Sequence, residues 1–166
     1  MNKKIFPKRD VEPDLDILMS LFDNEVMSTF FTGHLIIEAL LVQLIELKSS
    51  KKKKSIQNQN FPTKVKSCIE FQYFDEKLGD YLNLINDIRN NYAHNLGYNI
   101  TPDELFVLAE KAGNAGIDFS DDTIFLCKET AFEWYGVTGT IQEIFQNTAM
   151  DLSFIMEENG GTFKFN

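Results

Sequence analysis

Residues 25–48, EVMSTFFTGHLIIEALLVQLIELK, decide the fold of this chain. Apolar residues such as Phe30, Leu40 and Leu44 fall on nearly every side of a helix drawn over this stretch, and a helix that is apolar all round is buried. Asn24 directly precedes the stretch and is a favoured helix N-cap residue. These features predict a long helix that lies at the centre of a helical bundle.

Most of the remaining sequence is also predicted to be helical. An apolar stripe at helical spacing indicates a helix that ends at Gly97, a favoured C-cap residue. Pro62 and the string Thr101-Pro102-Asp103-Glu104 mark two further helix starts. The predicted helices cover residues 13–22, 25–48, 62–71, 78–97, 102–112, 121–135 and 140–158, and the stripe consists of Leu78, Tyr81, Leu82, Ile85, Ile88 and Tyr92.

Two segments are predicted to lie outside helices. Residues 49–60, SSKKKKSIQNQN, read as a polar, basic loop, and residues 162–165 alternate like a strand but have no obvious partner. There is no internal repeat and no break in composition, so we expect one domain over residues 1–166, with a short N-terminal arm at 1–13 and a tail at 160–166. The predicted fold class is all-α, a bundle of about five to seven helices.

The net charge of −9 is unevenly distributed along the chain. Residues 1–98 contain thirteen acidic and thirteen basic residues, whereas residues 99–166 contain twelve acidic residues and three lysines. An acidic chain is a poor general nucleic-acid binder, because affinity for the phosphate backbone comes mainly from Lys and Arg. Any RNA site must therefore be local. The candidate RNA-binding residues are Lys51, Lys52, Lys53 and Lys54, although such a run is more often a solvated loop.

Nothing in the sequence indicates a membrane protein or a cofactor enzyme. Residues 1–10 lack the apolar stretch of a signal peptide, and the most apolar stretch, residues 35–45, is interrupted by two polar residues and is too short to span a bilayer. Cys68 and Cys127 are isolated, which suits reduced thiols in a cytoplasm. No pair of Cys or His has metal-ligand spacing and there is no glycine-rich phosphate loop, so we expect no metal and no cofactor.

The string Arg89-Asn90-Asn91-Tyr92-Ala93-His94 suggests a specific chemistry. The chain has only two arginines and two histidines, and one of each meets in this R-N-x-x-x-H pattern. Metal-free RNA cleavage uses the 2′-hydroxyl as nucleophile and needs proton transfer and charge stabilisation. His94 can act as general acid or base, Arg89 can stabilise negative charge on the phosphate, and Asn90 can hydrogen-bond the phosphate or fix the tautomer of His94.

The spacing within this string allows structural alternatives. Five residues of helix separate Arg89 and His94 by about 140°, so they converge only if the helix bends, if Arg89 reaches around it, or if two subunits combine their strings. Arg89 could instead pair with Glu38 or another acid, and a histidine at a helix C-terminus is favoured by the helix dipole. His34 is expected to be a hydrogen-bonded core residue, and Trp134 either an interface anchor or part of a core aromatic pair.

Together with the helical architecture, this string resembles the HEPN superfamily. The resemblance covers roughly residues 24–158 in architecture and residues 78–98 in recognisable motif. Many HEPN domains are dimeric, metal-independent endoribonucleases of toxin–antitoxin and phage-defence systems. The resemblance implies that Arg89, Asn90 and His94 are catalytic and that a homodimer brings two copies of the string together.

The chain departs from one HEPN pattern. In HEPN toxins that pair with a nucleotidyltransferase antitoxin, a modified tyrosine follows the histidine by two residues, whereas this chain has Leu96 there and Tyr98 two residues further on. The helix order is also similar to that of the mannitol operon repressor family, a HEPN-like regulatory group. Two functions are therefore expected. One is a cytoplasmic endoribonuclease, a toxin or defence effector with RNA as substrate and an antitoxin as partner; the other is a non-catalytic dimeric regulator that acts through a protein partner.

Overall fold

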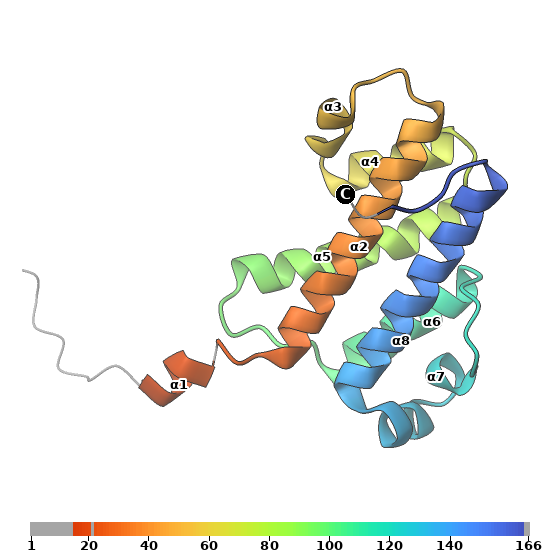
Figure 1. Cartoon of the computed structure of the whole chain (residues 1–166). Coiled ribbons are helices and arrows are strands. Elements are labelled where there is room, and N and C mark those ends of the chain that lie inside the picture. Colours follow the sequence, from red (N-terminus) through yellow and green to blue (C-terminus); the bar gives the residue numbers. More distant parts are fainter. Residues whose placement is uncertain (1–14, 21, 165–166) are drawn as a thin grey trace, which may run out of the picture.

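The structure is a computed structural model that describes residues 15–20 and 22–164, and these residues form an all-α bundle (Figure 1). The predicted fold class is therefore confirmed. The helices are α1 (Leu15–Ser20), α2 (Glu25–Lys48), α3 (Lys53–Gln57), α4 (Phe61–Glu70), α5 (Glu76–His94), α6 (Pro102–Asn114), α7 (Thr123–Leu126) and α8 (Lys128–Glu158). The predicted N-terminal arm, the start of the first helix at residue 13 and the last two residues of the tail lie outside the described residues.

Helix α2 has the predicted bounds and lies in the middle of the bundle. The Asn24 side chain caps it by accepting a hydrogen bond from the backbone N–H of Met27 at 2.8 Å. Helix α2 packs along α8 on one side and against α4 and α5 on the other, as Figure 1 shows. Its residues Ile37, Leu41 and Leu44 are fully buried. They anchor the hydrophobic core on this helix.

The apolar part of α2 is longer than the sequence analysis allowed. Within the described ranges, α2 is the helix whose length and composition would let it cross a membrane, and half of its most apolar window is buried in the fold. The prediction that the apolar stretch is too short was therefore wrong, because the helix continues on both sides of residues 35–45. Since α4, α5 and α8 pack against it, we interpret α2 as the core helix of the bundle.

The basic segment after α2 is not wholly a loop, as had been predicted. It contains the short helix α3, whose one apolar residue, Ile56, is fully buried. Burial of this side chain against α2 explains why a segment of such polar composition folds locally. Helix α4 then begins at Phe61, because the Asn60 side chain accepts a hydrogen bond from the backbone N–H of Thr63 at 2.9 Å.

The C-terminal half divides differently from the prediction. In place of one helix over 121–135, α7 ends at Leu126 and the chain leaves helical geometry at Cys127. Helix α8 then runs to Glu158 with a kink at Gly136, whose φ of 63° is one that glycine adopts readily. The predicted helices 121–135 and 140–158 therefore meet inside α8.

The C-terminal tail returns to the middle of α2. No strand occurs in residues 15–20 and 22–164, and the segment predicted to alternate like a strand pairs with a side chain instead. The Gln43 amide donates to the backbone carbonyl of Lys164 at 2.9 Å and accepts from its N–H at 3.1 Å. This amide supplies both hydrogen bonds that a neighbouring strand would have made.

Candidate active site

Helix α5 carries the R-N-x-x-x-H string in its last two turns. Asp75 caps the start of this helix, and the six residues of the predicted apolar stripe are all buried. The helix ends at His94, with Asn95 as its C-cap, and therefore stops before the predicted end. Gly97 lies in the following loop with a φ of 87°. The string is thus held on a rigid helix whose last residue faces solvent.

Arg89 is half-buried and faces α2. Its guanidinium carbon lies 5.7 Å from the centre of the Phe31 ring, and its Nη1 donates to Oδ1 of Asn90 at 3.3 Å. Its Nε is buried and has no hydrogen-bond partner among the described residues. The alternative that Arg89 pairs with Glu38 is wrong, because the Glu38 carboxylate pairs with Lys64 instead. The hydrogen bond to Asn90 is therefore the one that the described residues give this guanidinium.

His94 is exposed at the end of α5, and none of the described contacts joins it to Arg89. The five-residue spacing turns the two side chains to different sides of the helix, as expected from helix geometry. Within one chain, no described hydrogen bond or ion pair therefore links the acid–base candidate to the phosphate-binding candidate. Asn90 contacts Arg89 rather than His94.

A second histidine, His34, lies on α2, where the charge of Arg89 acts on it. It is buried, and its ring lies 4.6 Å from that of Phe61. Burial is the main reason that its pKa is lowered; the positive charge of Arg89 acts in the same direction, and the carboxylate of Glu38 opposes both. The prediction of a core histidine is confirmed, but its Nε2 has no hydrogen-bond partner in the described part of the chain.

Sequence reasoning missed two residues near this site, Phe31 beside Arg89 and Asn86 beside His34. Phe31 provides the ring beneath the guanidinium, and Asn86 is a buried polar residue on the stripe side of α5 that also acts on His34. Asn86 lies one turn after Leu82 and next to Ile85, both in the apolar stripe, and this position was a signal for a buried polar residue. Nothing in the sequence pointed to Phe31, since that contact depends on how α2 and α5 pack.

The loop after α5 is fixed by aromatic residues. Tyr92 accepts a hydrogen bond from the backbone N–H of Ile100 at 3.2 Å, and its ring packs edge-on against that of Tyr98 at 4.7 Å. Tyr98 donates to Glu104 at 3.3 Å. Burial, followed by the charge of Glu104, raises the pKa of Tyr98 to about 12. Leu96, at the position of the modified tyrosine in HEPN toxins, is 88% exposed.

The lysine run lies far from this string. Lys51, Lys52, Lys53 and Lys54 are exposed, and the last two begin α3, beyond the C-terminal end of α2. Arg89 contacts Phe31, near the other end of α2. About 25 Å of helix separates Phe31 from Lys48, so one chain does not bring the lysine run to Arg89. The described residues also bring together no three His, Cys, Asp or Glu side chains that could hold a metal ion.

Comparisons of the chain with protein-family models, with curated proteins and with solved structures give no match.

Proposed function

We propose that this protein is a metal-independent endoribonuclease of HEPN type, a cytoplasmic toxin or phage-defence effector. The observation that carries the proposal is the pairing, on one helix, of an arginine without an acidic partner among the described residues and an exposed histidine five residues later. Most arginines that are partly buried have a carboxylate partner, because an uncompensated buried charge is costly. A phosphate oxygen would supply the acceptor that Arg89 lacks.

The proposed reaction needs only protein side chains. The 2′-oxygen of a ribose attacks the adjacent phosphorus and loses its proton to a base, while the 5′-oxygen leaves and takes up a proton from an acid. The products are a 2′,3′-cyclic phosphate and a 5′-hydroxyl. His94 would exchange these protons, and its exposure at the end of α5 supports this role. The Arg89 guanidinium, oriented by Asn90 and Phe31, stabilises the added charge on the phosphorane oxygens.

We further propose that a homodimer completes the site. Arg89 faces α2 and His94 faces solvent at the end of α5, so a single chain presents each group without the other. Two-fold symmetry would place the His94 of one copy against the Arg89 of its partner. An RNA loop with splayed bases would suit this site, because an acidic chain offers little for a long duplex.

Purified protein incubated with a labelled RNA pool tests this function. Wild type should cut RNA in the presence of EDTA and leave 2′,3′-cyclic phosphate ends, whereas His94→Ala and Arg89→Ala should not. Asn95→Ala is the matched control, because Asn95 is the exposed neighbour of His94 and caps α5 through its backbone. Equal cleavage by all four proteins, or activity that is lost on chelation and restored by magnesium, would overturn the proposal.

A second candidate is a non-catalytic HEPN-like regulator that binds a protein partner, similar to the mannitol operon repressor family. The observation in its favour is the exposure of two large apolar side chains in the acidic C-terminal third, where Leu126 is 70% and Trp134 is 66% exposed. The expectation that Trp134 belongs to a core aromatic pair is wrong, and an exposed tryptophan is a common anchor of protein interfaces. Stable capture of a partner that Trp134→Ala abolishes, with no RNA cleavage by wild type, would favour this candidate.

A further inference from the structure

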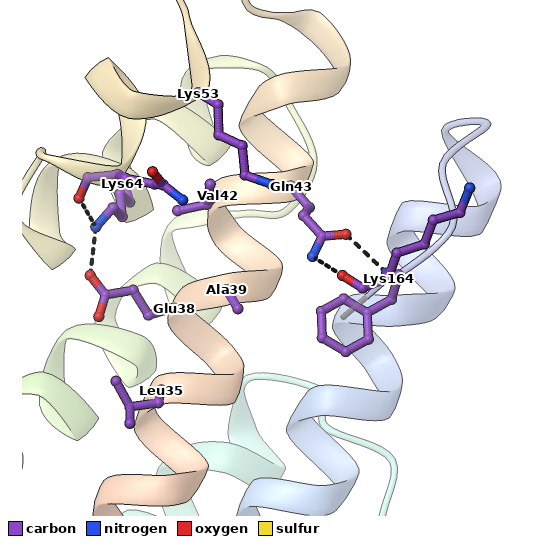
Figure 2. Close-up of a pocket in the computed structure, with 10 residues that line it drawn as sticks. Leu35, Glu38, Ala39, Val42, Gln43, Lys53, Lys64 and Lys164 are labelled. Atoms are coloured by element: carbon purple, nitrogen blue, oxygen red, sulfur yellow. Dashed lines mark hydrogen bonds and ion pairs between the residues drawn. The ribbon is translucent and has the colours of Figure 1, made fainter. Parts of the chain in front are cut away.

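A pocket of about 430 Å³ opens on α2 and is bordered by α3, α4 and the C-terminal tail. Figure 2 shows α2 as its floor, with Lys53 and Lys64 on one side and Lys164 on the other. Its volume lies at the small end of the range for ligand pockets, which suits one small molecule rather than a chain segment. The full lining consists of Leu35, Glu38, Ala39, Val42, Gln43, Lys53, Gln57, Lys64, Phe163 and Lys164.

The charge of the lining is opposite to that of the protein. Three lysines and one glutamate line the pocket, in a chain whose net charge is −9. Glu38 is already paired with Lys64, at 2.5 Å between Oε1 and Nζ. Neither Lys53 nor Lys164 forms an ion pair with any described residue. Among the described residues, Lys53 therefore keeps an ammonium group over α2 without an ion-pair partner, whereas the Lys164 side chain points away from Lys53 and Lys64 (Figure 2).

Lys64 is a cation held inside the fold at the base of this pocket. Its side chain is only 2% exposed, and its ammonium donates to Glu38 and to the backbone carbonyl of Gln57, the latter at 3.1 Å. An ammonium has three protons, so one is left for a further acceptor. A lysine buried in this way needs compensation for its lost hydration. A second anion in the pocket would add to the compensation that Glu38 provides.

The rest of the lining favours an organic group attached to the anion. Leu35 is 63% exposed, and with Ala39 and Val42 it gives α2 an apolar surface between the two walls. Lysine ammonium groups act as point charges that suit phosphate, whereas planar carboxylates are matched better by arginine. A phosphate monoester carries a charge of about −1.5 to −2 near neutral pH and offers acceptor oxygens both to Lys53 and to the remaining proton of Lys64.

We infer that this pocket binds a small organic phosphomonoester, with the phosphate between Lys53 and Lys64 and the organic group on the apolar floor. The inference does not rest on the proposed ribonuclease function, and its test uses no RNA. Titration calorimetry of the full chain with phenyl phosphate should give saturable binding at one site. Inorganic phosphate, which lacks the organic group, and benzoate, which carries a carboxylate instead, should each bind more weakly.

Two variants and one control locate the binding site. Lys53→Gln removes an exposed wall cation and should weaken phenyl phosphate binding by about tenfold or more. Ala39→Phe fills the floor without a change in charge and should abolish binding. Lys54→Gln removes the same charge from the next residue of α3, which does not line the pocket, and should leave binding nearly unchanged. Circular dichroism melting confirms that each variant is folded.

Four outcomes would overturn the inference. They are the absence of phenyl phosphate binding to wild type, equal weakening by Lys53→Gln and Lys54→Gln, unchanged binding to folded Ala39→Phe, and benzoate or inorganic phosphate binding as tightly as phenyl phosphate.

Discussion

The buried pair of Glu38 and Lys64 allows a prediction whose size follows from the structure. The two partners differ in burial, because the Lys64 side chain is 2% exposed and that of Glu38 is 30% exposed. The substitution Glu38→Gln removes the charge that compensates a buried ammonium, whereas Lys64→Met removes the ammonium itself. The two substitutions should therefore have unequal costs.

The magnitudes follow from the solvent access of the partner that remains. Breaking a fully buried pair by removing one partner costs about 3–5 kcal/mol. Water reaches Glu38 and screens part of this charge interaction, so we expect Glu38→Gln to lower the free energy of unfolding by about 2 kcal/mol. In Lys64→Met the apolar stem still packs, and the half-buried Glu38 gains hydration, so the change should stay within about 1 kcal/mol.

Urea unfolding followed by circular dichroism measures these values for wild type, both variants and the double variant. With both charges removed, the double variant should resemble Lys64→Met, which means that the two substitutions are not additive and differ from their sum by about 2 kcal/mol. Equal costs of the single variants, or a larger cost for Lys64→Met, would refute the reasoning that Lys64 is a buried cation dependent on Glu38.

Two further predictions concern α2. His34 has a lowered pKa in the fold, mainly through burial, so below about pH 6.5 the unfolded chain binds a proton that the folded chain does not, and stability should fall as the pH drops from 6.5 toward the lower folded value. Urea unfolding at pH 7.5 and 5.5 measures how much the free energy of unfolding falls between the two pH values. This fall should be smaller for His34→Phe than for wild type, and an equal fall would count against a neutral buried His34. A Cβ on Gly33 would lie 2.2 Å from the Phe145 ring, so Gly33→Ala should separate α2 from α8 and cost about 1–3 kcal/mol. Thermal melting checks this, with Gly139→Ala as the control, because a Cβ on Gly139 would have its nearest contact at 3.3 Å. Gly139→Ala should be neutral or stabilising. Equal melting temperatures of the two variants would contradict the prediction for Gly33.

Elements whose ends are set by local residues could be predicted from the sequence. Asn24 caps α2, and the capping box of Thr101 and Glu104 starts α6, because these side chains bond backbone groups only three residues away. The apolar stripe of α5 also became buried as predicted, since its spacing places it on one helix face.

Features that depend on packing between distant segments could not be predicted in this way. The single residue Ile56 packs α3 against α2. The sequence indicated a break after residue 135, but not that α8 continues through a kink at Gly136. Lys64 looked like any surface lysine, and its burial became apparent only once α3, α4 and α2 were assembled. In the candidate site, the R-N-x-x-x-H string could be read from the sequence, whereas the packing of the Arg89 guanidinium over the Phe31 ring could not.

The measurement that tests the proposed composite ribonuclease most directly is complementation between two inactive variants. Arg89→Ala and His94→Ala are mixed, allowed to exchange subunits and assayed for RNA cleavage. If Arg89 of one copy acts with His94 of the other, each mixed dimer keeps one intact pair, and the mixture should regain about a quarter of wild-type activity. A mixture that exchanges subunits but stays inactive, beside an active wild type, would show that the site lies within one chain; an inactive wild type would contradict the ribonuclease itself.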